Sequence, residues 1–326
     1  AIMDKTNIVK TKYNTPWIAN RADPYVYKSK DGFYYFTASV PEYDRIVLRK
    51  SKRLKDLAHA EEVVIWKKHD SGIMSEHIWA PEIHYLDDKW YIYFAAGERE
   101  DKWKIRPYVL ECQDEDPMTG QWIEKGKVQS CAGDELSFEA FSLDATVFEH
   151  RGKRYLVWAE KVQLKELVSN LYIAEMESPI KLKTKRMLLT TPEYDWEMVD
   201  FHVNEGPAIL KKNNKIFLTY SASSTGACYC VGMLIADEDA DLLNPDSWTK
   251  MKEPVLKTDE SKGVYGPGHN SFTISEDGKD IMVYHARQYS EIVGDPLYDP
   301  NRHAMFLEIK WNEDGTPKFE YMSIET

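Results

Sequence analysis

The stretch EIHYLDDKWYIYFAAG, from Glu82 to Gly97, contains the pattern that predicts the fold of this chain. A polar residue opens the stretch, and the pair Asp87-Asp88 interrupts it with a tight-turn signal. Both flanks of the turn are dense in the aromatic and β-branched residues that favour pleated strands. We therefore expect a strand, a hairpin turn and a second strand here.

The same pattern recurs along the chain at nearly constant spacing. Five polar residues, 59, 62, 61 and 64 positions apart, each precede a turn signal and a β-rich run: Asp23, Glu82, Asp144, Glu205 and His269. The turn signals are Asp31-Gly32, Asp87-Asp88, Arg151-Gly152, Asn213-Asn214 and Asp277-Gly278. Further strand candidates fill the space before the next polar residue, so each repeat contains about four strands.

Repeats of four strands with this kind of period are the signature of a β-propeller. We therefore predict an all-β fold, a five-bladed β-propeller with four antiparallel strands per blade. The period exceeds the roughly 40 to 50 residues of compact blades, so we expect the surplus in loops that could wall a pocket. Because no Pro/Ser-rich linker is visible, we expect residues 1–326 to form a single catalytic domain.

The five repeated polar residues predict a functional site. If each holds the same place on the innermost strand of its blade, four carboxylates and one imidazole converge near the axis. Burying several like charges together is costly unless they are paired or functional. One such residue alone could simply cap a loop or bind backbone amides. The repetition favours the functional interpretation.

Composition narrows the classes of partner. The net charge is −12 and no Lys/Arg block stands out, so we expect no nucleic-acid partner. No apolar stretch approaches the roughly 18 residues of a membrane span, so we expect no membrane partner. The first residues lack the features of a signal peptide, which predicts a cytoplasmic protein, or a secreted or periplasmic one if such a peptide has been removed. We expect a monomer.

The four cysteines predict neither a disulfide nor a zinc site. Cys228 and Cys230 lie two apart on one expected strand face, a poor geometry for a bond between them. A C-x-C pair without a second pair does not complete a four-ligand zinc site. We expect Cys112, Cys131, Cys228 and Cys230 to be free thiols.

One motif in each repeat resembles glycoside hydrolase family 43, and within it the exo-acting α-L-arabinofuranosidases that attack α-1,5-arabinan. The motifs are NRADPYV (20–26), WAPEIH (79–84), SLDATVF (142–148), NEGPAIL (204–210) and YGPGHNSF (265–272), followed by YHAR (284–287). The resemblance covers nearly the whole chain. It implies the family's five-bladed propeller and an inverting mechanism, alongside the argument from the repeats.

The resemblance also implies roles for three carboxylates. Asp23 matches the general base, Glu205 the general acid, and Asp144 the third carboxylate that raises the acid's pKa and orients it. The base must be ionised to activate water, whereas the acid must keep a proton near neutral pH. For inversion, we expect the carboxyl groups of Asp23 and Glu205 to stand roughly 6.5 to 9.5 Å apart.

Four further residues are candidates for binding. Trp79 could stack on a sugar or pack in the core, and Glu82 could bind sugar or cap the turn beside it. Arg287 matches the family arginine that binds the terminal sugar, but it could equally form a structural ion pair. By resemblance, His269 is expected to help hold a calcium ion through water. No cofactor is expected to be required for the chemistry.

The leading hypothesis is an exo-α-1,5-L-arabinofuranosidase acting on arabinan or arabino-oligosaccharides. The alternatives are another family 43 activity, namely removal of arabinose side chains from arabinoxylan, β-xylosidase or endo-arabinanase, and a non-catalytic sugar-binding propeller. Exo action needs a cleft that is closed at one end. The insertions at 97–107 and 191–202 look long enough to provide this closure.

Overall fold

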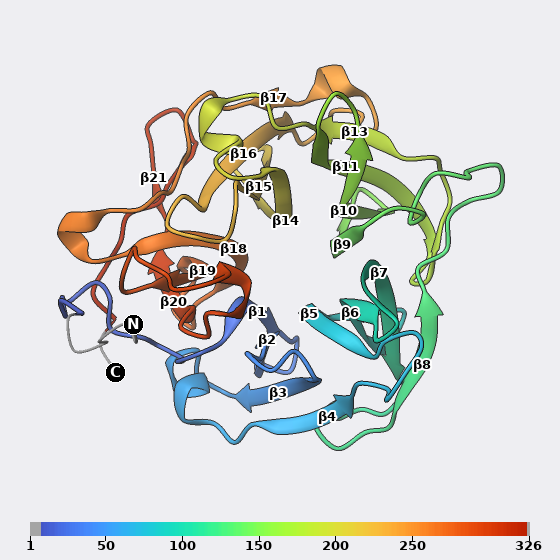
Figure 1. Cartoon of the computed structure of the whole chain (residues 1–326), viewed down its shortest axis with the longest axis horizontal. Coiled ribbons are helices and arrows are strands. Elements are labelled where there is room, and N and C mark those ends of the chain that lie inside the picture. Colours follow the sequence, from blue (N-terminus) through green and yellow to red (C-terminus); the bar gives the residue numbers. More distant parts are fainter. Residues whose placement is uncertain (1–7, 325–326) are drawn as a thin grey trace.

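The computed structural model describes residues 8–324, and its regular structure is almost entirely β-strand. The helical elements are short 3-10 turns: Lys55–His59 (η2), Asp195–Glu197 (η3), Pro245–Ser247 (η4), Glu260–Lys262 (η5) and Pro296–Tyr298 (η6). The strands form antiparallel sheets that stand around a common axis (Figure 1). The prediction of an all-β fold is confirmed.

The first two repeats each form a four-stranded sheet in sequence order. The first contains β1 (Ala22–Lys28), β2 (Tyr34–Ser39), β3 (Arg45–Ser51) and β4 (Val63–Lys67). The second contains β5 (Glu76–Leu86), β6 (Lys89–Glu98), β7 (Asp101–Cys112) and β8 (Trp122–Lys127). The strand, turn and strand predicted at Glu82–Gly97 are therefore β5 and β6.

The third and fourth repeats share one path of paired strands. The third contains β9 (Ser142–His150), β10 (Lys153–Gln163), β11 (Leu167–Ser178), β12 (Lys181–Leu182) and β13 (Met187–Thr190). The fourth contains β14 (His202–Lys212), β15 (Lys215–Ala222), β16 (Cys230–Asp237) and β17 (Thr249–Lys250). Within each repeat the pairing is antiparallel, and a short parallel pairing of β11 with β14 joins the two.

The last repeat has three strands in its sheet: β18 (Tyr265–Ile274), β19 (Asp280–Arg287) and β20 (His303–Glu308). A single antiparallel bridge between Ile18 and Ala304 ties the start of the chain to β20. A small hairpin follows, made of β21 (Lys310–Trp311) and β22 (Pro317–Lys318). Because two repeats share a path and one has three strands, the count of five four-stranded blades stays a prediction.

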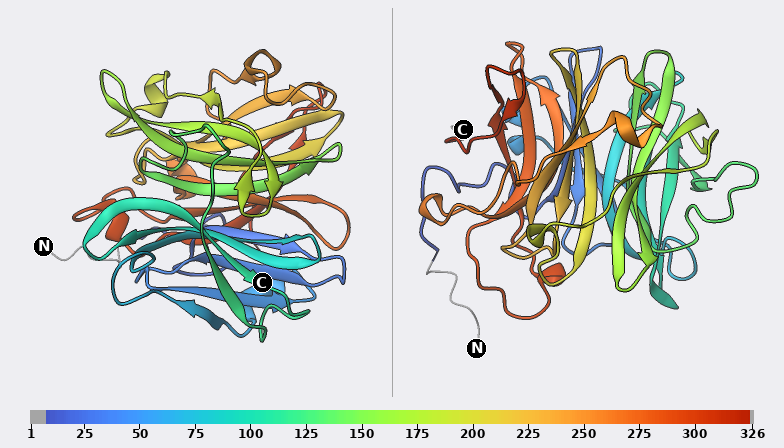
Figure 2. Two further views of the ribbon diagram at one scale, coloured as in Figure 1. Left: turned by 90° about the vertical axis from the view of Figure 1, so that its right-hand side faces the viewer. Right: turned by 90° about the horizontal axis from the view of Figure 1, so that it is seen from above.

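The core consists of side chains packed between neighbouring sheets. Figure 2 shows neighbouring sheets standing face to face. Trp17 is 4% exposed and lies between the first and last sheets. Its ring meets Phe36 edge-on at 6.0 Å between centroids and Phe306 at 5.1 Å. One buried indole therefore packs against both the first and the last sheet.

Each innermost strand contains a bulge with a residue in the left-handed conformation. These residues are Asp23, Ala80, Asp144, Gly206 and His269, with φ between +41° and +60°. A bulge re-aims the side chains around it. The equivalent positions are therefore 57, 64, 62 and 63 residues apart.

This register corrects one premise of the sequence analysis. In the second and fourth repeats the equivalent residues are Ala80 and Gly206, and not Glu82 and Glu205. Glu82 lies two residues beyond its bulge residue, and Glu205 lies one residue before. The five polar residues therefore do not occupy the same position on their strands.

Two predictions from composition concern the described part of the chain. All four cysteines are free, as predicted, and Cys228 lies before the start of β16. Over residues 8–324, none of the helices combines the length and the apolar character that crossing a bilayer requires.

The position of Trp17 between the first and last sheets predicts a large effect for Trp17→Ala. The change removes a buried indole between the first and last sheets, so we expect a loss of about 3 to 5 kcal/mol in the free energy of unfolding. Denaturant unfolding followed by fluorescence measures it. Phe201→Ala, at a ring that is 64% exposed, is the control and should change stability by about 0.5 kcal/mol or less. Equal effects of the two changes would contradict this account.

Candidate active site

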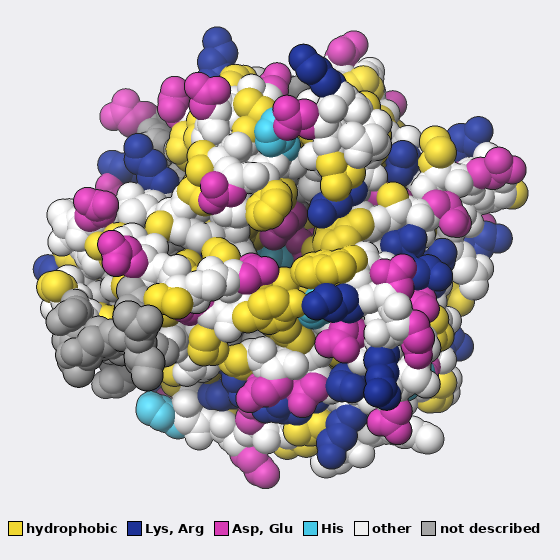
Figure 3. Space-filling view, in the orientation of Figure 1, with side chains coloured by type: hydrophobic (Ala, Val, Ile, Leu, Met, Phe, Trp, Pro, Cys, Tyr) yellow, Lys and Arg dark blue, Asp and Glu magenta, His cyan; other side chains and the backbone are white. Residues whose placement is uncertain are grey.

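A hollow opens at the centre of one face of the molecule (Figure 3). Acidic and histidine side chains lie on its floor, and hydrophobic side chains surround it. Three of the predicted residues, Asp23, Asp144 and His269, come from bulges on β1, β9 and β18. Glu205 joins them from β14. The structure therefore brings the three predicted carboxylates and His269 into one cluster.

His269 lies between the acids of this cluster. Its Nδ1 is 3.1 Å from Oδ1 of Asp23 and 3.9 Å from Oδ2 of Asp144. Polar atoms of Asp144, Glu205 and His269 lie within 4.8 Å of one another. The N–H of Gly206 donates to Oδ2 of Asp144 at 2.9 Å. A Cβ at Gly206 would stand 3.2 Å from the His269 ring, and φ there is +57°, so glycine suits this position.

Asp23 is held in its ionised form. Its carboxylate accepts from Oγ of Ser39 at 2.5 Å, and its N–H donates to Nδ1 of His285 at 3.0 Å. Nη1 of Arg302 lies 4.0 Å from Oδ1. Burial alone would raise the pKa of Asp23, but the charges of His269 and Arg302 and the hydrogen bond from His269 hold it well below its usual value. The carboxylate is therefore charged at neutral pH.

Asp144 and Glu205, by contrast, share a proton. Burial is the main cause that raises the pKa of both, and it brings that of Asp144 to about 8. The charges of neighbouring carboxylates add to the effect, whereas His269 opposes it. The phenol of Tyr229 donates to Oε2 of Glu205 at 2.9 Å, which also favours the charged form. Because two close carboxylates do not readily both ionise, the pair retains a proton at neutral pH.

The two histidines of the site differ in charge. Burial lowers the pKa of His285 to about 3, so its ring is neutral. Burial would lower that of His269 too, but the charges of Asp23 and Asp144 raise it to about 10. His269 is therefore an imidazolium among carboxylates. This contact is the main electrostatic compensation in the cluster.

His285 and Tyr229 connect the two carboxylates that differ in protonation. Their rings stack at 5.5 Å with an interplanar angle of 10°. His285 accepts from the backbone of Asp23, and Tyr229 donates to Glu205. Since Nδ1 of His285 accepts, the ring proton is on Nε2, which has no acceptor within residues 8–324.

Sequence reasoning missed four residues of this site: Ser39, Tyr229, His285 and Arg302. His285 lies inside the YHAR motif, one position from a conspicuous tyrosine and two from Arg287, so that motif contained a usable signal. The other three lie outside all the motifs, and only the fold brings them to the carboxylates.

Trp79 occupies a packed position. It is 8% exposed, and its ring stacks on His77 at 4.5 Å with an angle of 25°. Trp103 and Phe141 lie 6.2 and 6.4 Å from it. Of the two interpretations of Trp79, packing describes the contacts observed, and sugar stacking stays a prediction. Among these four rings, that of Trp103 is the one open to solvent, with 46% exposure.

Glu82 and Arg287 are both engaged within the protein. Glu82 is 6% exposed and lies 3.1 Å from Nε2 of His84. Arg287 is 3% exposed, and its guanidinium donates to the carbonyls of Thr225 and Pro296 and to Asp299. The ion pair of Arg287 with Asp299 matches the structural alternative for that residue. The contact of Glu82 with His84 is neither a turn cap nor a sugar contact. The roles of Glu82 and Arg287 in sugar binding stay predictions, and Arg302 is the arginine that faces Asp23.

The surroundings of His269 are a poor match for calcium. Calcium takes six to eight oxygen ligands, whereas the group of side chains that meet here is Asp144, Glu205 and His269. Nδ1 of His269 is already directed at Asp23, 3.1 Å away. Asp144 and Glu205 are also the two groups that retain a proton between them. The predicted calcium stays a prediction.

The sequence profile of glycosyl hydrolases family 43 matches residues 13–317. An extracellular exo-α-(1→5)-L-arabinofuranosidase of Streptomyces avermitilis is 53% identical over 94% of this chain and 63% of its own length. A protein of the same name from Streptomyces chartreusis is 52% identical over 87% of this chain and 85% of its own. The chain thus spans less than two thirds of the first of these relatives.

Solved structures agree with these relatives. The crystal structure of an α-L-arabinofuranosidase from Lactobacillus brevis superposes with a TM-score of 0.88 at 51% identity, covering 94% of this chain and 96% of that one. A thermostable family 43 glycoside hydrolase, at 24% identity and a TM-score of 0.74, covers 94% of each chain and shares the fold. The resemblance read from the five motifs is confirmed.

The charge cluster predicts the titration of His269. Asp23→Asn removes a charge that raises its pKa, so we expect the pKa to move from about 10 toward that of an exposed imidazole, about 6.5. Nitrogen-15 NMR of the histidine side chains over a pH series measures this. His285 serves as the internal control and should stay neutral throughout. An unchanged titration of His269 would contradict the proposed ion pair.

Proposed function

Since the chain belongs to glycosyl hydrolases family 43, we propose that it is an exo-acting α-L-arabinofuranosidase. It would release arabinose from the ends of α-1,5-linked arabinan or arabino-oligosaccharides. The observation that carries the proposal is the contrast within one cluster between an ionised Asp23 and a protonated Asp144–Glu205 pair. The printed names of the Streptomyces relatives support the substrate and the exo mode.

In the proposed reaction, Asp23 acts as the general base. Its carboxylate takes a proton from a water molecule as the water oxygen bonds to the anomeric carbon of the terminal arabinose. A charged carboxylate suits this task, and the cations His269 and Arg302, with the donor Ser39, keep Asp23 charged. The anomeric carbon inverts because water attacks opposite the leaving group.

Glu205 is the proposed general acid. As the glycosidic bond breaks, its proton passes to the departing oxygen and leaves Glu205 as a carboxylate. Asp144 keeps a proton available because the two groups resist ionising together. Its contact with the Gly206 N–H orients it beside the acid. The predicted separation of roughly 6.5 to 9.5 Å between the Asp23 and Glu205 carboxyl groups belongs to this proposal.

We also propose that the five repeats are the blades of one five-bladed propeller, within a single domain. Support comes from the sheets around a common axis, the equivalent bulge in every repeat and the bridge from Ile18 to Ala304. The word extracellular in the names of two relatives supports action outside the cell. A monomeric state and the lack of a nucleic-acid partner stay predictions.

A product time course on linear α-1,5-arabino-oligosaccharides tests the proposed function. We expect arabinose from the first time point, and little release of nitrophenol from an aryl xyloside run in parallel. A mixture of shorter oligosaccharides would indicate endo action, and preferred release of xylose would indicate a xylosidase. Tight binding without turnover would favour a sugar-binding protein.

Glu205→Ala should affect substrates according to their leaving groups. An arabino-oligosaccharide needs a proton on its departing oxygen, so we expect its kcat/KM to fall about 10²- to 10⁴-fold. An aryl arabinofuranoside with a good leaving group should lose much less. Asp23→Ala is the matched comparison and should abolish turnover of both substrates. Equal losses for Glu205→Ala on the two substrates would exclude Glu205 as the acid.

Tyr229→Phe should shift the pH dependence of kcat/KM. Activity requires the proton of the Asp144–Glu205 pair, so we expect it to fall as pH rises past about 8. Removing the phenol donor destabilises charged Glu205 and raises its pKa, so the decline should move to higher pH. Tyr289→Phe, which removes a phenol that donates to Asp299, is the control and should leave the profile unchanged. A decline that moves to lower pH would contradict the assignment.

A further inference from the structure

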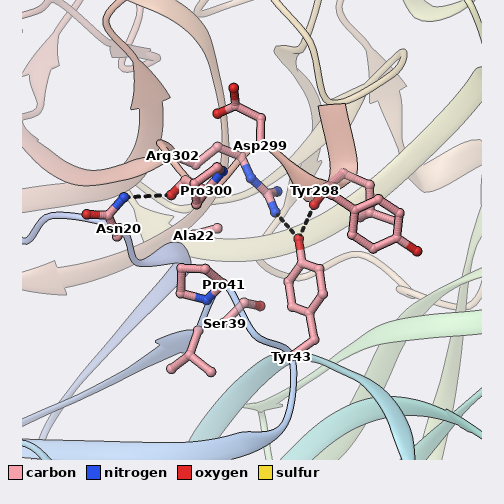
Figure 4. A pocket seen from close by; sticks show the side chains of 11 residues that line it. Asn20, Ala22, Ser39, Pro41, Tyr43, Tyr298, Asp299, Pro300 and Arg302 are labelled. Atoms are coloured by element: carbon pink, nitrogen blue, oxygen red, sulfur yellow. Dashed lines mark hydrogen bonds between the residues drawn. The ribbon is translucent and has the colours of Figure 1, made fainter. Parts of the chain in front are cut away.

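A loop of the last repeat crosses the face of the molecule beside Asp23. It joins β19 to β20, contains η6, and reaches toward the first sheet (Figure 4). The carbonyl of Leu297 accepts from the phenol of Tyr43, which is 7% exposed. Nη2 of Arg302 donates to the same phenol at 2.7 Å. Two residues of the loop are therefore fixed to the first repeat through one phenol, that of Tyr43.

The same loop is fixed to the second sheet through His77. Nε2 of His77 lies 2.9 Å from the Tyr298 hydroxyl, and Nδ1 lies 3.1 Å from the carbonyl of Lys102, at the tip of the β6–β7 hairpin. Because a carbonyl only accepts, the proton is on Nδ1 and Tyr298 donates to Nε2. The rings of His77 and Tyr298 stack at 6.0 Å and 30°. We call Tyr43, His77, Tyr298 and Arg302 the rim bridge.

The rim bridge lies on the side of the site where the base is. Arg302 stands 4.0 Å from Asp23, and Ser39, which donates to Asp23, accepts from the N–H of Ala80 at 2.8 Å. Ser39 and Arg302 also line a small hollow with Tyr43 and Tyr298 (Figure 4). This hollow has room for about one water molecule and not for a sugar ring.

In an inverting reaction the attacking water and the leaving chain occupy opposite sides of the site. Water held by Asp23 attacks opposite the departing oxygen, which takes its proton from Glu205. The leaving chain therefore lies on the Glu205 side. In an α-L-arabinofuranoside C5 lies on the ring face opposite the departing oxygen, so a second sugar attached at O5 would extend from the face that the water of Asp23 attacks, where the bridge stands.

We propose that the rim bridge is the wall that ends the sugar-binding cleft, so that only one terminal arabinose fits between it and Glu205. This inference rests on the proposed function. It makes exo action a property of contacts among three sheets, with Tyr298 as the specificity-determining side chain. Tyr298 is 49% exposed, so part of its ring is open to solvent.

Tyr298→Ala tests the wall. In a time course on arabinohexaose, we expect the native protein to release arabinose alone. The variant should release arabinobiose as at least about a tenth of its first products, because truncation removes the phenol ring that ends the cleft. Tyr298→Phe keeps the ring and loses only the hydroxyl, so it should keep arabinose as its product. Tyr85→Ala, at a ring 40% exposed near the opposite end of β5, controls for loss of a surface aromatic.

The outcomes separate the two proposals. Arabinose alone from Tyr298→Ala, with a thermal midpoint like that of the native protein, would overturn the wall and leave the proposed function intact. Native protein inactive on arabinohexaose would overturn the proposed function itself. If Tyr298→Ala does not fold, Tyr298→Val replaces it, because that change keeps an apolar side chain in the loop but removes the ring, and it should also yield arabinobiose. Arabinose alone from Tyr298→Val would overturn the wall as well.

Discussion

The contact of protonated His269 with Asp23 and Asp144 is the interaction on which the site depends. Three buried carboxylates without a cation would repel one another and lose their hydration, at a cost of several kcal/mol for each charge. The His269 imidazolium offsets more of this cost for Asp23 than for Asp144 and Glu205. It lies nearest Asp23 and keeps that group charged, whereas Asp144 and Glu205 share what remains and hold a proton. The cation thus favours the charged form of Asp23, while burial and repulsion between carboxylates keep a proton on the Asp144–Glu205 pair.

The fold holds this cluster through its repeats. A bulge in each innermost strand gives Asp23, Asp144 and His269 the backbone conformation that turns their side chains toward the axis. Gly206 allows the close approach of His269, and its N–H fixes Asp144. The stack of His285 on Tyr229 then links the backbone of Asp23 to the carboxylate of Glu205. Base and acid are therefore positioned by one connected set of contacts between sheets.

Sequence patterns predicted the strands and the three carboxylates because hairpin periodicity and motif context are local properties. The bulge register could not be predicted, and it separates Glu82 from the cluster while Glu205 remains in it. Arg302 and His77 were missed because their partners come from distant repeats. The insertion at 97–107 contains the tip of the β6–β7 hairpin and supports the rim bridge. The insertion at 191–202 is instead held to the fourth repeat by buried Glu197, which contacts Tyr220. Length alone did not distinguish the two.

The most direct test of the account is the anomer formed first. Proton NMR of arabinotriose hydrolysis, recorded before mutarotation equilibrates the product, identifies it. A charged Asp23 and a protonated Glu205 on opposite sides of the sugar predict a single displacement by water and β-arabinose as the first product. α-Arabinose appearing first would mean retention through a covalent intermediate, and would contradict the roles assigned to these two carboxylates.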